Sequence, residues 1–495
     1  MVARKAVSEK ASKAVTPAVV PPVYIIGAGM LRFGKYQDRS IKDLAAEAVR
    51  TALKDAGLEK DRIEALWFAN SGWGMNGGQD CIRGQVALRP SGVEDIPIVN
   101  VENACAGGAT ALNGAFLGIA SGQYDVAMAV GAEKVFQPDR IKMFASFIGA
   151  LDVENLESLI EQARSAGRET GLPPPPASVA AHPPRSLPDQ LKGLAQKGRE
   201  LPVLVRNLIV ITDHYQIDLW KLVRQNVEAR FRKGAGASSG GMDHSPFMDV
   251  YAMACRRHMK KYGSTQRQLA VIAAKNHSHS AVNPLAQIQK PMTVDQVMAD
   301  KSIAWPLTRS MCAPIGDGAA AAIVCSGRFF RKLQDRQRAV RILASAIGSG
   351  RNRSEDEPDI GERLSRRAYA VAGIGPGDVN LAECHDATAF GELHQSEALG
   401  FCEEGKGGEL AESGATRIGG RIPLNTSGGL ESRGHPIAAS GLAQIYEVVT
   451  QLRGEAGERQ VEGARIGLTQ NGGGALGVEE AAMGIHILER VAARR

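Results

Sequence analysis

The sequence predicts an α/β protein that is built from two similar halves. Apolar segments of strand length alternate with amphipathic helical segments from residue 23 onward. A helix, a glycine stop and a strand at residues 48–66 recur at residues 364–382. Each copy leads to a reactive residue set among small residues, Cys105 in the first half and His435 in the second. This duplication predicts two related domains with an active site in the cleft between them.

The first half begins with a predicted strand at residues 23–26, which read Val-Tyr-Ile-Ile. A helix is expected next because apolar residues recur on one helical face, at Ile41, Leu44, Ala48 and Ala52. Gly57 is positioned to end that helix, and further strands are predicted at residues 65–68 and 126–130.

The second half repeats this order. Residues 364–372 predict a helix that Gly373 ends, and strands are predicted near residues 379–382 and 464–468. A Pro-rich run at residues 171–176 and a Gly-rich run at residues 234–241 interrupt the pattern between the halves. We therefore divide the chain into a disordered tail at 1–21, an N-terminal half at 22–135 and 242–335, a largely helical insertion at 136–241 and a C-terminal half at 336–495.

Composition excludes several classes of protein. The chain has 495 residues, of which 44% are apolar and 23% charged, and a net charge of +6 without a run of like charges, so no nucleic-acid partner is expected. The longest uncharged stretch, residues 103–124, is rich in Gly, Ala and Ser and predicts a buried helix, not a membrane span. Seven cysteines without a Cys-x2-Cys pair predict neither a disulfide framework nor a structural zinc site. We expect a reducing, cytoplasmic location.

Cys105 is the candidate nucleophile. It lies in Glu-Asn-Ala-Cys-Ala-Gly-Gly at residues 102–108, where a buried helix is expected to start. A lone cysteine is more often a small buried apolar residue, but the histidine motif Gly-His-Pro at residues 434–436 favours the catalytic interpretation. A helix N-terminus and a nearby His435 could lower a thiol pKa of ~8.5 by about two units, which predicts a thiolate.

Three further groups are candidates. His385 follows a predicted strand, from which its ring could donate a hydrogen bond to a substrate carbonyl oxygen. The glycine run follows the strand predicted to end at residue 468, and the exposed N–H groups of Gly472 and Gly473 could provide an oxyanion hole together with the N–H of Cys105. A plain tight turn is the alternative interpretation of this run. His277 and His279 are two residues apart and would diverge on a strand, so we expect no metal site there.

These motifs together resemble the thiolase superfamily, and they are most similar to thiolases of the sterol-carrier-protein type. The resemblance is strongest in the last 115 residues, and it also covers residues 22–135 and 250–326. The motifs that carry the resemblance in the last 115 residues follow one another in the family's order. They are His-Asp at 385–386, Glu-Ala-Leu-Gly-Phe-Cys at 397–402, Asn-x-Ser-Gly-Gly at 425–429, Gly-His-Pro at 434–436 and Leu-Arg-Gly-Glu-Ala-Gly at 452–457.

The resemblance implies a thiolase fold, a five-layered αβαβα core of two duplicated halves, in a homodimer or homotetramer. It implies coenzyme-A thioester substrates, with free coenzyme A as co-substrate and with neither a metal nor a permanently bound cofactor. By position, Cys105 would accept the acyl group, His435 would be its base, and His385 would polarise the thioester oxygen. The N–H groups of Cys105, Gly472 and Gly473 would hold the other oxygen.

The chain departs from the family at the second acid/base. Thiolases that make or break a carbon–carbon bond carry another cysteine, and the matching positions here are Gln470 and Ala387, neither of which can move a proton. Cys384, Asp386 and Glu392 are the candidate substitutes. Cys384 is the weakest of them, because neighbouring side chains on a strand point to opposite faces.

Several functions remain open on the sequence. The first is a thiolase that cleaves or condenses β-ketoacyl-CoA through an acyl-cysteine, with a bulky or aromatic acyl group in a degradation pathway, as in the benzoylsuccinyl-CoA branch. Relatives of that branch imply a small zinc-ribbon and OB-fold partner subunit, which the long insertion would suit. The alternatives are a decarboxylating condensing enzyme or acyltransferase of the ketoacyl-synthase type, against which Gly-His-Pro argues, and an inactive scaffold subunit.

Overall fold

The computed structural model describes residues 20–138, 143–144, 147–155, 244–354, 356–477 and 479–491. Residues 1–19, most of the predicted tail, lie outside the described residues, and so do residues 156–243, which include most of the predicted insertion at 136–241. The described part includes all the candidate site residues and all seven cysteines, which are free thiols. No helix in this described part combines the length and the apolar content that crossing a bilayer requires.

Nine strands form one mixed sheet in the order β3-β2-β4-β7-β1-β8-β11-β10-β9 within the described residues. Their bounds are β1 Val23–Met30, β2 Ala65–Ala69, β3 Ile98–Val101, β4 Val126–Lys134, β7 Asp317–Ser326, β8 Val340–Ser349, β9 Leu381–Glu383, β10 Ile466–Leu476 and β11 Glu479–Arg490. Only three residue pairs join β1 to β8, against nine between β4 and β7 and nine between β11 and β8. The sheet therefore consists of two parts with a narrow connection between them. A separate small ribbon pairs β5 Ser302–Ala304 with β6 Leu307–Thr308.

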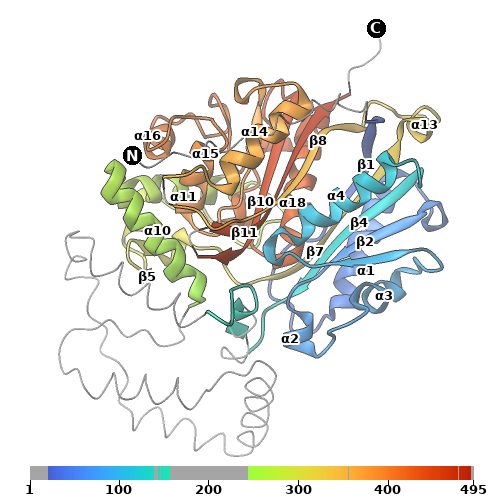
Figure 1. Cartoon of the computed structure of the whole chain (residues 1–495), viewed down its shortest axis with the longest axis horizontal. Helices are drawn as coiled ribbons and strands as arrows, with labels where there is room; N and C mark the ends of the chain where they lie inside the picture. The colour runs from blue at the N-terminus through green and yellow to red at the C-terminus, as the bar shows by residue number, and fades with distance from the viewer. Residues whose placement is uncertain are drawn as a thin grey trace, which may run out of the picture.

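The helices cover both parts of the sheet. Their bounds are α1 Ile41–Ala56, α2 Trp73–Gly77, α3 Arg83–Leu88, α4 Gly107–Ala120, α10 Pro246–Tyr262, α11 Gln266–Ala281, α12 Val294–Met298, α13 Gly327–Phe330, α14 Ile360–Ala372, α15 Ala389–Ala398, α16 Gly407–Glu412, α17 Gly429–Arg433 and α18 Ser440–Arg453. Figure 1 shows the blue and cyan N-terminal strands on one side of the molecule and the orange and red C-terminal strands on the other.

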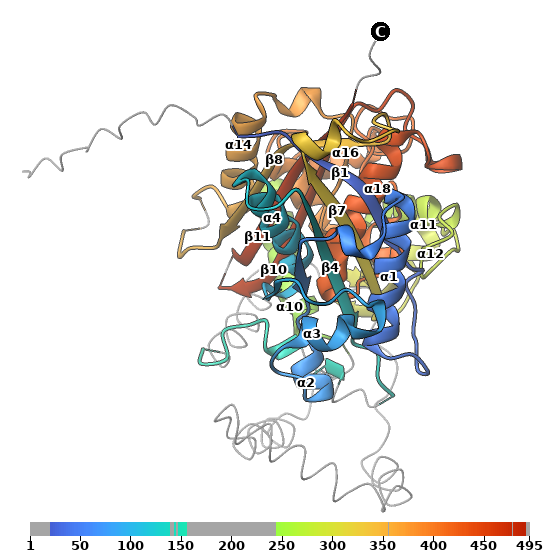
Figure 2. The ribbon, with the colours of Figure 1, turned by 90° about the vertical axis from the view of Figure 1, so that its right-hand side faces the viewer.

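The layers follow from which strands each helix packs against. Helix α1 packs on β1, β4 and β7, whereas α14 packs on β8 and β11. Helices α4 and α18 pack on each other and on strands of both parts. Figure 2 shows α1 and α14 on opposite sides of the strands. The order is therefore helix, sheet, paired helices, sheet, helix, which confirms the predicted five-layered α/β fold.

The duplicated segments have the local structure that their sequences predict. Ser40 caps α1 in a capping box with Asp43, and Gly57 ends the helix at φ 61°. In the second copy the Asp359 side chain caps α14, and Gly373 ends it at φ 70°. The apolar faces of both helices are buried against the strands.

Two local expectations are wrong. The run Gln-Asn-Gly-Gly-Gly at 470–474 is not a turn after a strand but part of β10, which extends to Leu476 because it pairs with β11. The segment with His277 and His279 is the helix α11, not a strand. Both rings are buried, and His279 Nδ1 lies 3.0 Å from the carbonyl oxygen of Asn425.

The two central helices approach each other at glycine. A methyl group on Gly108 of α4 would lie 2.8 Å from the Ala438 oxygen and 2.9 Å from the Leu442 nitrogen. We expect Gly108→Ala to lower the free energy of unfolding by about 1–3 kcal/mol, because the backbone of α18 must shift. Urea denaturation measures this, with Gly377→Ala as the control because no atom lies within 4 Å of the added methyl group. Equal stability of the two variants would show that the crossing tolerates a side chain.

Candidate active site

Cys105 lies in a 3-10 turn, Ala104–Ala106, that leads directly into α4. The turn begins with Ala104 at φ 47°. Its backbone is held by the Glu102 carboxylate, which accepts the Ala104 N–H at 2.6 Å, and by the Asn103 oxygen, which accepts the Ala106 N–H at 2.9 Å. The nucleophile is therefore placed one turn before the helix by contacts among its immediate neighbours.

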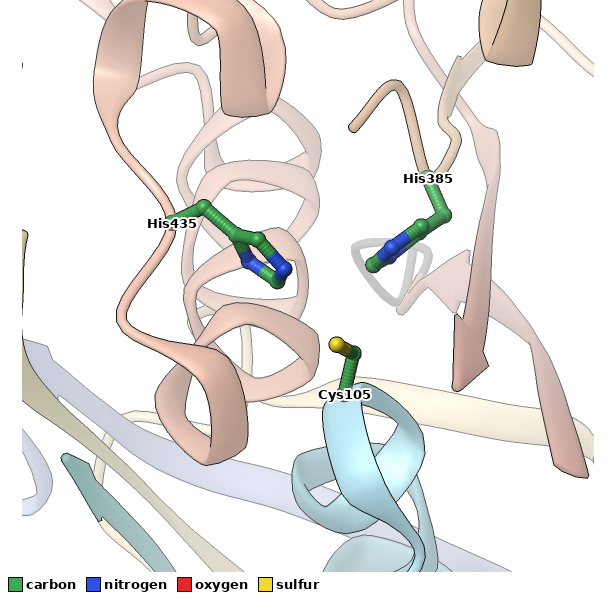
Figure 3. A group of neighbouring side chains, drawn as sticks. All are labelled: Cys105, His385 and His435. Carbon is green, nitrogen blue, oxygen red and sulfur yellow. The ribbon is translucent and has the colours of Figure 1, made fainter. Parts of the chain in front are cut away.

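The two histidines come from the C-terminal half. His385 follows β9 by two residues, and His435 lies between α17 and a 3-10 turn that begins α18. The Cys105 sulfur and one nitrogen of each ring all lie within 4.8 Å of one another. The ring centroids are 5.1 Å apart at an interplanar angle of 81°. Figure 3 shows the three side chains pointing toward one another, Cys105 from the start of a helix and the two histidines from separate loops.

Hydrogen bonds of Ser440 determine which ring nitrogen of His435 carries the proton. The Ser440 hydroxyl lies 3.2 Å from the Pro436 carbonyl oxygen, to which it donates, and 2.7 Å from His435 Nδ1. Because a hydroxyl has a single proton, its oxygen accepts the proton of Nδ1–H. The lone pair of Nε2 is then available to take the thiol proton.

Loss of Ser440 should weaken this base. We expect Ser440→Ala to lower kcat about tenfold, because both ring tautomers of His435 become available and only one can act as the base. KM should change less than kcat, since the hydroxyl contacts the ring and not the substrate. Separate measurement of kcat and KM, with a thioester substrate of the kind that the resemblance implies, tests this. An unchanged kcat would show that another contact selects the tautomer.

His385 is oriented by residues of β10. The Asn471 amide nitrogen lies 3.1 Å from His385 Nδ1, and because that nitrogen only donates, Nδ1 accepts and the ring proton is on Nε2. The Gln470 Oε1 accepts the backbone N–H of His385 at 2.8 Å. Gln470, at the position where a family cysteine is expected, therefore holds the backbone of His385.

Burial keeps the three residues neutral. It lowers the pKa of His385 to about 3, with a smaller contribution from Arg433, and it lowers the pKa of His435 well below its usual value, with contributions from His385 and Arg433. Burial, then Glu133, Glu480 and Glu102, raise the pKa of Cys105 to about 12. The thiolate expected from the sequence is therefore wrong for the resting site. The resting pair is a thiol and a neutral imidazole.

The glycine run reaches Cys105, although the run is part of a strand. A methyl group on Gly473 would lie 2.8 Å from the Cys105 nitrogen, so the two backbones are in contact. The backbone of Gly474 forms a hydrogen bond with the Cys105 sulfur, which lowers the thiol pKa. Gly474 is a contact that the sequence did not indicate, since any of the three glycines could have faced the cysteine.

The three substitute acid/base candidates have other contacts. Cys384 packs in an apolar cluster with Leu424 and Ile485, and burial raises its thiol pKa well above the usual value. Glu392 forms a buried ion pair with Lys275 at 2.5 Å. Asp386 accepts hydrogen bonds from the Leu430 backbone at 2.7 Å and from Asn276 at 3.1 Å. These groups form a buried network that supports the loop before His435.

Comparisons with known proteins match this architecture. Residues 23–156 match the family model described as "Thiolase, N-terminal domain", and residues 360–489 match "Thiolase C-terminal domain-like". Acetyl-CoA acetyltransferase of Methanothermobacter thermautotrophicus is 35% identical over 94% of this chain and 99% of its own length. Sterol carrier protein 2 of Oryctolagus cuniculus is 33% identical over 92% of this chain and 70% of its own.

A more distant relative and two solved structures are also similar. Benzoylsuccinyl-CoA thiolase subunit BbsB of Thauera aromatica is 29% identical over 91% of this chain and 94% of its own. A structure described as Ltp2-ChsH2(DUF35) aldolase aligns with a TM-score of 0.65 and 22% identity, over 96% of this chain and 99% of that one. Human mitochondrial 3-ketoacyl-CoA thiolase aligns with a TM-score of 0.59 and 14% identity, over 96% of this chain and 100% of that one. These two structures show the fold.

The chain belongs to the thiolase family. It is accordingly an enzyme of the acyltransferase class. The resemblance to the sterol-carrier-protein type that the motifs indicated is confirmed by the second relative.

Proposed function

We propose that this thiolase-family enzyme cleaves a β-ketoacyl-CoA with free coenzyme A, or runs the reverse condensation, through an acyl group on Cys105. The observation that carries the proposal is that the side chains of Cys105, His385 and His435 converge. The ring proton of His435 is placed by Ser440, and that of His385 by Asn471. A base with a free lone pair faces the thiol, and a neutral N–H donor stands beside it. This is the arrangement that thiol addition to a carbonyl requires.

In the cleavage direction, the Cys105 sulfur adds to the β-keto carbon while its proton passes to His435 Nε2. The N–H groups of Cys105 and of the glycines at 472–473 are the proposed donors to the oxygen of that carbon. The bond between the α and β carbons then breaks, and an enolate of the shorter acyl-CoA forms. The Nε2–H of His385 is the proposed donor to the enolate oxygen, which is the role that its tautomer suits.

The acyl group and the setting are further parts of the proposal. We propose a bulky or aromatic acyl group and a degradation pathway, which the similarity to a protein named benzoylsuccinyl-CoA thiolase subunit supports. A homodimer or homotetramer with a small partner subunit is also proposed. Two similar proteins are named as parts of assemblies, one as a subunit and one together with ChsH2(DUF35).

Assays of thiolysis test the proposal. We would follow loss of acetoacetyl-CoA and of 3-oxo-3-phenylpropionyl-CoA, each with and without free coenzyme A, with the partner subunit added in parallel. Cleavage that requires coenzyme A, with a higher kcat/KM for the aromatic substrate, is expected. Carbon dioxide release from malonyl-CoA without thiolysis would instead establish the decarboxylating alternative. Equal rates for both β-ketoacyl substrates would remove the aromatic part of the proposal.

A further inference from the structure

The proposed reaction needs a proton at the α-carbon of the departing acyl-CoA, and the active-site contacts described so far do not supply it. His435 holds the proton of Cys105, and His385 faces the enolate oxygen. Asp386 and Glu392 are held within the buried network by Leu430, Asn276 and Lys275. A further titratable group near Cys105 is therefore required.

Glu480 is such a group. It is the second residue of β11 and lies opposite Ala475 of β10. Its carboxylate lies directly against the backbone of Gly472, so that a methyl group on Gly472 would clash with both of its oxygens. Its charge contributes to the raised pKa of Cys105 and of Tyr251 on α10. The carboxylate therefore lies against the glycine run, one residue before Gly473, which contacts the backbone of Cys105, and it is near enough for its charge to act on the thiol.

The Glu480 carboxylate is half-buried, and among the described residues no group donates a hydrogen bond to it or forms an ion pair with it. Its neighbour on the strand differs in this respect, because Glu479 is bound by Arg353 at 3.1 Å and by Arg363 at 2.9 Å. A carboxylate without donors is poorly stabilised as an anion. It can therefore hold a proton at a pH where Glu479 cannot.

The groups around Glu480 agree with this. Burial raises its pKa first, Asp359 at the start of α14 and Glu479 raise it further, and His394 of α15 opposes them, which gives a pKa of about 8. Tyr251 remains a neutral phenol, since burial and then Glu480 raise its pKa well above 10. Near neutral pH the Glu480 carboxyl group is therefore mostly protonated but close to its midpoint, as a proton-transfer group must be.

We infer that Glu480 is the second acid/base of the site and exchanges a proton with the α-carbon of the coenzyme-A thioester. This inference rests on the proposed thiolase function. In cleavage, the α carbon–β carbon bond breaks, and its electron pair takes the Glu480 proton, which leaves a carboxylate. The thiol of the incoming coenzyme A then gives its proton to that carboxylate, and its sulfur attacks the acyl-Cys105. The Cys105 sulfur leaves and recovers its proton from His435, so every group returns to its starting state.

The test compares Glu480→Gln with Glu489→Gln, a half-buried glutamate at the far end of the same strand whose carboxylate lies 3.5 Å from Arg341. The probe for proton transfer is acetyl-CoA in D2O, with deuterium at its α-carbon measured by mass spectrometry. The probe for acyl transfer is the mass of the acyl-enzyme formed after incubation with a thioester. We expect Glu480→Gln to lose exchange about 10²-fold or more and still to form the acyl-enzyme, because a thiolate leaves without a proton. Glu489→Gln should match the wild type in both.

The pH profile and a second variant separate this role from a structural one. In the wild type, exchange should rise with pH up to about 8 and then level off, because the carboxylate is the base. Glu480→Asp keeps a carboxyl group and should exchange faster than Glu480→Gln. Unchanged exchange in Glu480→Gln, or equal loss of exchange and of acyl-enzyme, would overturn the inference. No acyl-enzyme in the wild type would instead contradict the proposed function.

Discussion

Cys105→Ala is expected to form no acyl-enzyme with any thioester and to lose at least about 10³-fold in thiolysis, which corresponds to about 4 kcal/mol of transition-state stabilisation. The reason is that the sulfur both attacks the β-keto carbon and carries the acyl group. A ring nitrogen of each histidine lies within 4.8 Å of the sulfur, but an acyl group on imidazole hydrolyses readily and would not persist as an acyl-enzyme, and the glycine run offers only backbone.

The matched control is Cys81→Ala, which removes an exposed thiol. It should keep full thiolysis and the full mass shift. A mass shift that persists in Cys105→Ala would assign the acyl group to another residue. A mass shift that is lost in Cys81→Ala would show that the adduct is a surface reaction.

His435→Ala is expected to lower thiolysis by about 10²–10⁴-fold, the usual contribution of a general base. Without Nε2 the neutral thiol has no acceptor for its proton, and burial holds its pKa at about 12. Alkylation of Cys105 by iodoacetamide, followed by peptide mass spectrometry in a Cys81→Ala background, reports the same step. At pH 7 the variant should be alkylated more slowly than the wild type.

The pH dependence of this alkylation gives a second check. Because the thiol pKa is raised, the thiolate fraction is small at neutral pH and increases with pH, so the wild-type rate should still rise above pH 9. An alkylation rate that reaches a plateau near pH 7 would contradict the neutral resting pair. It would support a resting thiolate, as the sequence predicted. Equal rates in the variant and the wild type at pH 7 would show that another group activates the sulfur.

Much of the fold follows from local pattern. The helix at Ile41–Ala56 and its copy at Ile360–Ala372 each have an apolar face, a side-chain cap and a terminal glycine, and all three signals are short-range. The full length of β10 was not predictable in this way. Its glycine run resembles a turn, and only pairing with β11, a contact between strands, makes it extended.

The sequence indicates candidate site residues where the motif is contiguous, as at Cys105 and His435, and the structure brings these two side chains together. The direction of the shift in the Cys105 pKa could not be predicted from the sequence. The carboxylates that raise this pKa belong to Glu133 on β4 and Glu480 on β11, and Glu480 is far from Cys105 along the chain. Glu480 itself gives no signal in the sequence. It is one of two adjacent glutamates after a glycine run. Only the folded structure shows that Glu479 is paired with arginines and that the Glu480 carboxylate lies against Gly472.

The most direct test of the central claim is intact-protein mass spectrometry of the wild type after incubation with acyl-CoA thioesters, before and after free coenzyme A is added. The account predicts a covalent acyl adduct on Cys105 that coenzyme A removes as a new acyl-CoA. Absence of the adduct with every thioester tested would contradict an acyl-cysteine mechanism.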